Sequence, residues 1–192
     1  MKLVSTVIVG LSICSFAFGG PVERKAAAQK VFANVCSACH GDNAEGMEGY
    51  SPKLQGQVAA YVQKSIKDFK KGNRFPEHKE QVQDLDKKTI IGMGEFLEEK
   101  VTVTNAIPTT ADNKNIAKFY HQKCASCHGQ NGEGTDFGSR LQGQYASYME
   151  EELQNFADGK RPLRMMQSGM YNLNGDKKLM HDVSVYLSAG AQ

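Results

Sequence analysis

Two five-residue segments, "CSACH" at residues 36–40 and "CASCH" at residues 124–128, carry the most reactive side chains of this 192-residue sequence. In each, a histidine directly follows the second of two closely spaced thiols. Two thiols at this spacing can add to the two vinyl groups of one porphyrin, and the adjacent imidazole can bind the iron. The pattern predicts two covalently bound haem c groups, attached through Cys36, Cys39, Cys124 and Cys127.

A single C-x-x-C segment would also suit a redox dithiol, a zinc site or a structural disulfide. Here both copies are followed by histidine, and the fifth cysteine, Cys14, lies in the N-terminal apolar segment. These alternatives therefore fit the sequence less well than haem attachment. His40 and His128 are the predicted proximal iron ligands.

Residues 1–20 have the pattern of a secretory signal peptide, with an early lysine, an apolar run and small residues at the end. The apolar run is short for a transmembrane helix, although a retained anchor is an alternative. We therefore expect an exported mature chain, with membrane association left open.

The composition is that of a soluble globular protein, with 23% charged residues and a net charge of +2. Basic and acidic residues are mixed along the chain. Because nucleic-acid binding needs a clustered basic surface, the sequence argues against it.

The chain is duplicated at an offset of about 88 residues, from Cys36 to Cys124. Similar segments recur after each histidine: "GDNAEG" and "GQNGEG", "KLQGQ" and "RLQGQ", then "DKKTIIGMGEFL" and "DKKLMHDVSVYL". Apolar positions in the last pair have helical spacing. We predict an all-α chain of three helices per unit, with domains at 21–100 and 111–192 and a linker at 101–110.

The architecture resembles class I cytochromes c, and the tandem arrangement resembles the dihaem cytochrome c4-like group. The resemblance rests on both C-x-x-C-H motifs, an aromatic residue four positions upstream of each, the "P-x-L-x-G-Q" segment and an aromatic-rich last helix. It implies two tandem domains with pseudo-twofold symmetry, each a few helices wrapped around a covalent haem. It also implies electron transfer between redox partner proteins in the periplasm.

The resemblance also assigns a role to Pro52, whose backbone carbonyl would orient the proximal histidine. The second unit has Ser139 at this position. The sixth iron ligand of the family is a methionine before the last helix. Counting back from Leu173 gives Met166, with Met165 as the alternative and Met170 as pocket lining.

The first unit has no methionine at this place, and the same count back from Leu85 gives His78. We expect His/His ligation at the first haem and His/Met ligation at the second. Three alternatives stay open: Lys79, Met93, or no sixth ligand. Lysine must first lose a proton at a pKa of about 10.4, against about 6.5 for histidine, so imidazole is the easier ligand.

Together these features predict an electron carrier rather than an enzyme. The alternative is a haem enzyme or enzyme subunit, acting on peroxide or a sulfur compound, or a sensor whose first haem admits a ligand. His121 and His181 are predicted to be structural or surface residues.

Overall fold

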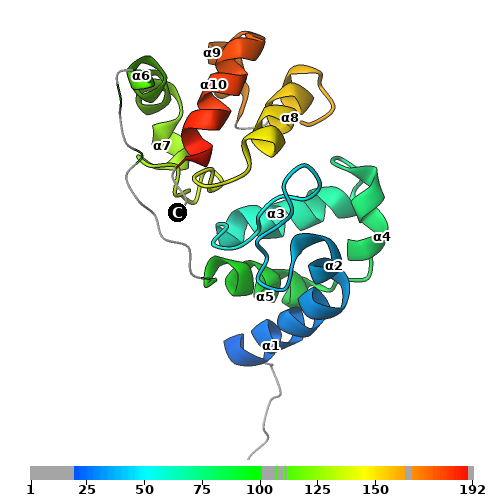
Figure 1. Cartoon of the computed structure of the whole chain (residues 1–192). Coiled ribbons are helices and arrows are strands. Elements are labelled where there is room, and N and C mark those ends of the chain that lie inside the picture. Colours follow the sequence, from blue (N-terminus) through cyan, green and yellow to red (C-terminus); the bar gives the residue numbers. More distant parts are fainter. Residues whose placement is uncertain (1–19, 101–106, 108–109, 111, 163–165, 190–192) are drawn as a thin grey trace, which may run out of the picture.

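The computed structural model describes residues 20–100, 107, 110, 112–162 and 166–189, and within these ranges the regular elements are all helical. They form two lobes (Figure 1). The all-α prediction is therefore confirmed. The predicted signal peptide and most of the predicted linker lie outside the described residues.

The first lobe contains seven helical segments within the described residues: α1 (Pro21–Val31), η1 (Phe32–Cys36), α2 (Ser37–His40), α3 (Ala59–Lys70), η2 (Pro76–His78), α4 (Lys79–Val82) and α5 (Lys87–Glu98). The second lobe repeats the plan with α6 (Lys114–Lys123), α7 (Ala125–His128), α8 (Ala146–Ala157), α9 (Gln167–Leu173) and α10 (Lys177–Ser188). The three long helices of each lobe correspond to the three predicted from the repeat.

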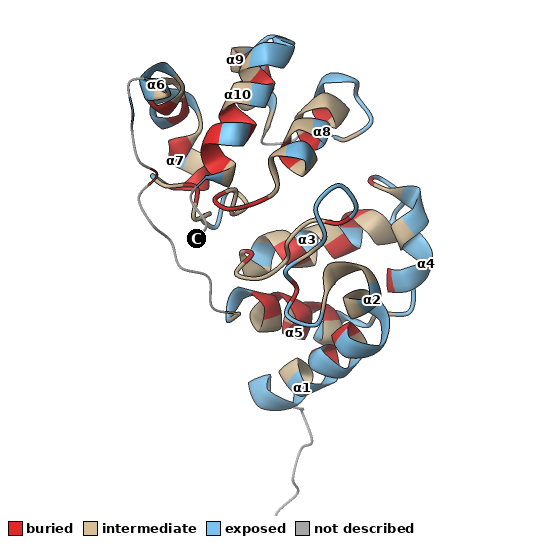
Figure 2. Ribbon diagram, viewed as in Figure 1, coloured by how far each residue is buried: buried red, intermediate tan, exposed pale blue. Residues whose placement is uncertain are grey.

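The first and last helices of each lobe pack through matching aromatic positions of the repeat. Phe32 contacts Phe96 edge to face at 5.4 Å between ring centroids, and Tyr120 lies 6.1 Å from Tyr186. Figure 2 shows buried residues on the inward faces of the helices of each lobe. The aromatic residue before each C-x-x-C-H segment thus anchors its helix in the core.

Helices α1 and α5 approach especially closely at Gly92. A Cβ at this position would lie 2.7 Å from the carbonyl carbon of Arg24 and closer still to its oxygen, so only glycine permits the crossing. The Arg24 guanidinium also pairs with the Glu95 carboxylate. In the second lobe, Asp182 occupies the place of Gly92, so this contact belongs to the first lobe alone.

Each last helix begins at the aspartate of a "DKK" segment. Asp86 accepts a hydrogen bond from the Thr89 N–H at 2.7 Å, and Asp176 accepts one from the Leu179 N–H at 3.0 Å. These side chains satisfy backbone donors that have no partner within the helix. The cap fixes where each last helix starts after the preceding loop.

The lobes are joined by two reciprocal glutamine contacts. The Gln144 amide accepts from the Lys53 N–H at 3.0 Å and donates to the Lys53 carbonyl at 2.8 Å. Gln57 makes the same pair of bonds to Arg140, at 2.7 and 3.0 Å. We call these contacts the glutamine clamps. They give the junction the pseudo-twofold symmetry that the resemblance implied.

None of the helices in the described part of the chain is long and apolar enough to span a membrane.

Candidate haem sites

Both histidines predicted as proximal ligands are held by a backbone carbonyl. Nδ1 of His40 lies 2.9 Å from the Pro52 oxygen, and Nδ1 of His128 lies 2.8 Å from the Ser139 oxygen. An Nδ1–H that donates here leaves Nε2 free to bind a metal. The carbonyl partner expected of Pro52 is present, and Ser139 supplies the same acceptor without the proline ring.

Small residues and hydroxyls shape the loop around each histidine. A Cβ at Gly138 would lie 2.5 Å from the Cys127 oxygen and 3.0 Å from Nδ1 of His128. Glycine at this position therefore leaves room for the ring. The Ser51 and Thr135 hydroxyls donate to the carbonyls of Cys39 and Cys127, respectively. Each loop is thus tied to the second attachment cysteine of its own domain.

The four cysteines predicted to attach haem are free and partly buried: Cys36, Cys39, Cys124 and Cys127. Burial raises the pKa of the Cys36 and Cys124 thiols to about 11 each. Both groups are therefore protonated at neutral pH, and net addition of the S–H bond across a vinyl group would give a thioether. Their chemistry and accessibility suit covalent haem attachment.

Burial also keeps the proximal imidazoles neutral. Desolvation lowers the pKa of His40 and of His128 below the usual value, because a buried charge is poorly solvated. The positive charge of Arg161 adds to this effect at His128. Since a metal binds the neutral imidazole, this electrostatic environment favours ligation.

His78 ends η2 and lies, half-buried, against two aromatic rings. Its ring stacks on Phe69 at 5.0 Å with an interplanar angle of 25°, and Phe75 lies 5.8 Å away. Burial lowers its pKa, and its Nδ1 is buried without a hydrogen-bond partner. A buried polar atom of this kind is costly unless something binds the ring.

The two histidines of the first domain lie within electrostatic reach of each other. A charge on His78 lowers the pKa of His40 in addition to the larger effect of burial. The alternatives to His78 are placed less favourably. Lys79 is exposed, and Met93 is buried in the core on α5, as the helical pattern predicts.

In the second domain, Met166 is partly buried against the core directly before α9. A Cβ at Gly169 would lie 3.3 Å from its Cε and 3.7 Å from its sulfur. Glycine therefore provides the space that the methionine side chain occupies. Met170 is buried in the same core, as expected of a lining residue, whereas Met165 lies outside the described residues.

Two predictions for other histidines also agree with the structure. His121 and His181 are exposed, and Nδ1 of His181 contacts the Glu150 carboxylate at 2.9 Å.

Phe75 is a residue whose importance the sequence does not reveal. It adopts a left-handed backbone, φ 39°, and holds its ring near His78. No glycine or asparagine at this position signals such a conformation in the sequence.

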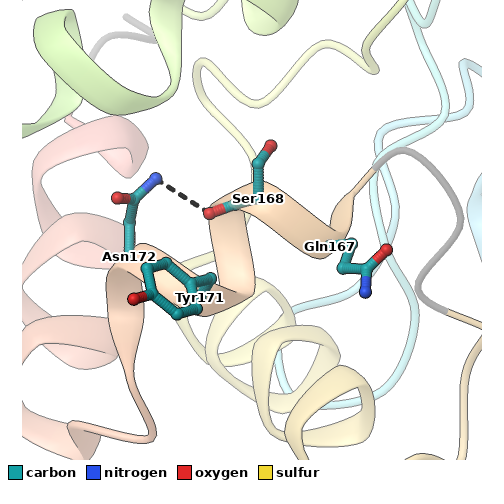
Figure 3. A pocket seen from close by; sticks show the side chains of 4 residues that line it. All are labelled: Gln167, Ser168, Tyr171 and Asn172. Atoms are coloured by element: carbon teal, nitrogen blue, oxygen red, sulfur yellow. Dashed lines mark hydrogen bonds between the residues drawn. The ribbon is translucent and has the colours of Figure 1, made fainter.

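An open hollow on the outer face of α9 is separate from these sites. Gln167, Ser168, Tyr171 and Asn172 line it, and Figure 3 shows the Asn172 amide donating to the Ser168 carbonyl. The opposite face of α9 carries the buried Met170 and Leu173. The hollow is therefore a feature of the surface over the methionine-bearing loop.

The residues present suit haem c in both domains. Each domain offers two free thiols, an oriented neutral imidazole, and a further imidazole or thioether at the corresponding loop position. Met or His is a common sixth ligand of haem iron. The repeated fold and the two donor sets define a dihaem c-type cytochrome.

Comparison with known proteins also identifies a c-type cytochrome. Residues 25–85 and 113–184 match the cytochrome c family, once in each lobe, and the chain therefore belongs to that family. It carries two covalently bound haem c groups. Cytochrome c4 of Azotobacter vinelandii is 28% identical over 208 residues, which cover 97% of this chain and 92% of the relative.

Solved structures give the same result for the fold. The crystal structure of reduced cytochrome c4 from Pseudomonas stutzeri superposes with a TM-score of 0.74 at 25% identity, covering 88% of this chain and 98% of that one. Thiosulfate dehydrogenase of Marichromatium purpuratum has a TM-score of 0.69 at 22% identity, covering 88% of this chain but 40% of that one. At this identity the second likeness concerns the fold alone. The chain is thus a cytochrome c4-like dihaem protein.

Proposed function

We propose that this protein carries electrons between redox partner proteins in the periplasm, using two haems with unequal axial ligands. His40 and His78 are the proposed ligands of the first haem. His128 and Met166 are those of the second. The N-terminal leader sequence supports export, and the cytochrome c4 relatives support the carrier role.

The observation that carries the proposal is the difference between the two ligand loops. The duplicated folds have matching carbonyl partners for His40 and His128, but one loop presents a partly buried imidazole whose Nδ1 has no hydrogen-bond partner and the other a partly buried thioether. Haem c supplies one-electron chemistry between ferric and ferrous iron. A methionine ligand raises the potential of such a centre relative to a histidine ligand.

The side chains then favour one direction of electron flow. His78 would stabilise the ferric state in the first domain, and Met166 would stabilise the ferrous state in the second. Pro52 and Ser139 would hold both proximal rings in place, which limits structural change when the charge on the iron changes. We therefore expect electrons to pass from the first domain to the second.

The surroundings of His78 favour a carrier over an enzyme. Its ring stacks on Phe69 and lies near Phe75, and neither side chain can exchange a proton with a substrate; the charged groups that act on its pKa are Glu77 and Arg74. A haem enzyme would use an acid or base beside an open iron position. The two aromatic rings instead suit a retained ligand.

Partner contact is supported by two exposed aromatic residues at matching positions. Tyr50 is 70% exposed and Phe137 is 69% exposed, each in the loop after its C-x-x-C-H segment. The Tyr50 hydroxyl lies 3.8 Å from the sulfur of Cys39. Apolar contact near an attachment cysteine would bring a partner close to the edge of the haem.

A potentiometric titration of the haem-loaded protein tests the proposal. We expect two separate one-electron transitions, with the lower potential at the first haem. Addition of carbon monoxide to the reduced protein should cause no rapid binding at either iron. Two equal high potentials would contradict the unequal ligands, and rapid binding at one haem would favour an enzyme or sensor.

A further inference from the structure

A buried charge cluster joins the two lobes near the pseudo-twofold axis. Arg74 Nη2 donates to the Glu152 carboxylate at 2.8 Å and to the Tyr148 hydroxyl at 2.5 Å. Arg161 also pairs with Glu152, and its Nη2 donates to the Tyr61 hydroxyl at 2.9 Å. We call these five residues the junction cluster.

The cluster follows the duplication except at its carboxylate. An offset of 87 residues pairs Tyr61 with Tyr148 and Arg74 with Arg161, but it pairs Glu152 with Ser65. Ser65 takes part as a neutral acceptor, 3.2 Å from Nη1 of Arg74. The two domains thus contribute equivalent cations, whereas the carboxylate comes from the second domain alone.

Glu152 is required electrostatically at this position. The side chains of Arg74 and Glu152 are 6% and 8% exposed, so little solvent screens the charges. Buried charges are costly unless they are paired. Without the carboxylate, two guanidinium groups from different domains would face each other at the junction. Glu152 therefore opposes a repulsion that would push the domains apart.

The cluster also reaches toward the proposed iron ligands. The Arg74 guanidinium lies 5.2 Å from the Phe69 ring and 5.1 Å from the Phe75 ring, and both rings contact His78. In the other domain, Arg161 lies 4.2 Å from the ring of Phe156, the repeat partner of Phe69. The junction cluster is therefore continuous with the ligand loop of the first domain and with the matching aromatic residue of the second.

The junction cluster also contains two buried polar atoms that no hydrogen bond satisfies. Nε of Arg74 and Oε1 of Glu152 are buried without a hydrogen-bond partner. The cluster holds two guanidinium groups and one carboxylate with little exposure to solvent, so its charges act on their surroundings with little screening. A charge change at Glu152 should be felt in both haem-binding domains.

We propose that Glu152 is a positioning residue for electron transfer: its carboxylate holds Arg74 and Arg161 together across the junction and sets the electrostatic potential at both haems. This role rests on the proposed function, because it concerns the rate and driving force of exchange between two bound haems. It predicts that one residue outside both ligand sets tunes the two centres together.

The test is Glu152→Gln, which removes the charge and keeps the size of the side chain. Loss of a negative charge disfavours the more positive ferric state, so both midpoint potentials should rise. At a fixed solution potential, the ratio of reduced to oxidised haem should increase severalfold at each centre. The rate of electron exchange between the haems, measured after rapid reduction of one of them, should fall severalfold. Glu151→Gln, a charge loss at the exposed neighbouring position, is the matched control and should leave both readouts unchanged.

A second variant, which moves the carboxylate to another position, distinguishes an electrostatic effect on the haem potentials from damage to the fold. In the Glu152→Gln background, Ser65→Glu returns a carboxylate to the symmetry-related position beside Arg74, and both potentials should return toward those of the wild type. If Glu152→Gln does not accumulate as holoprotein, Glu152→Asp in the wild-type background keeps the charge and should keep the potentials. Potentials that stay fixed in Glu152→Gln, or that are not restored by Ser65→Glu, overturn the inference. A wild-type protein without two reversible transitions would instead overturn the proposed function.

Discussion

Replacing Gln144 with alanine should weaken the docking of the two domains by removing one glutamine clamp. The substitution deletes the bonds of the amide to the Lys53 N–H and carbonyl, at 3.0 and 2.8 Å. A protein hydrogen bond contributes about 0.5–1.5 kcal/mol net, so two contribute about 1–3 kcal/mol. Since about 1.4 kcal/mol is a factor of ten, docking should weaken between about fivefold and about a hundredfold.

Hydrogen exchange at the Arg140 amide measures this effect, because that N–H donates to Gln57 and keeps its acceptor in Gln144→Ala. Its protection should fall by the same factor in Gln144→Ala, whereas the Lys53 amide loses its own acceptor and should exchange faster whether or not the domains separate. Gln130→Ala, at an exposed glutamine of the same domain, is the control.

A double-mutant cycle with Gln57→Ala shows whether the clamps act as a unit. Effects smaller than additive are expected if the first substitution already separates the domains. Unchanged protection of the Arg140 amide in Gln144→Ala would refute the view that the clamp holds the junction.

Other predictions concern single domains. Gly92→Ala should destabilise the first domain by about 1–3 kcal/mol in thermal unfolding, because the new Cβ would clash with the Arg24 carbonyl; an unchanged Tm would contradict the close crossing. Gly169→Val should displace Met166, because the Cε of Met166 lies 3.3 Å from the position that a Cβ at residue 169 would take. The variant should lose the spectroscopic signature of methionine ligation at the second haem and keep the spectrum of the first haem unchanged. Arg24 hydrogen-bonds to Glu95 and holds the pKa of that carboxyl below its usual value. This stabilisation is fully present above the unfolded pKa of about 4.3 and is lost as the pH falls through the folded value. Glu95→Gln should therefore lower the Tm at neutral pH, with a difference from wild type that disappears in acid.

Much of the fold and of the proximal sites follows from local sequence. The aromatic residues Phe32 and Tyr120 precede the haem motifs at a fixed distance and are buried where the repeat places them. Pro52 could be identified as the carbonyl acceptor for His40 because the segment around it resembles a known pattern. Asp86 and Asp176 occupy matching places before the last helices and cap them. In each case, neighbours along the chain determine the role.

The junction could not be predicted in the same way, because its partners are distant in sequence. Glu152 lies in the run "MEEELQ", which looks like a solvated helix face until α8 packs against the other domain. Arg74 follows the polar run "KKGN", which gives no sign of a buried partner, and in the fold it is buried against Glu152. Gln57 and Gln144 belong to a repeated segment whose length gives no hint that each copy binds the other.

The unequal ligation of the two haems is the central claim, and it rests on His78. Axial ligands should be assigned by electron paramagnetic resonance and near-infrared magnetic circular dichroism on the ferric holoprotein and on His78→Met. The wild type should show one His/His and one His/Met haem, and the variant should lose the His/His signal and gain a second His/Met signal. Two His/Met haems in the wild type, or a His/His signal that survives in His78→Met, would contradict the account.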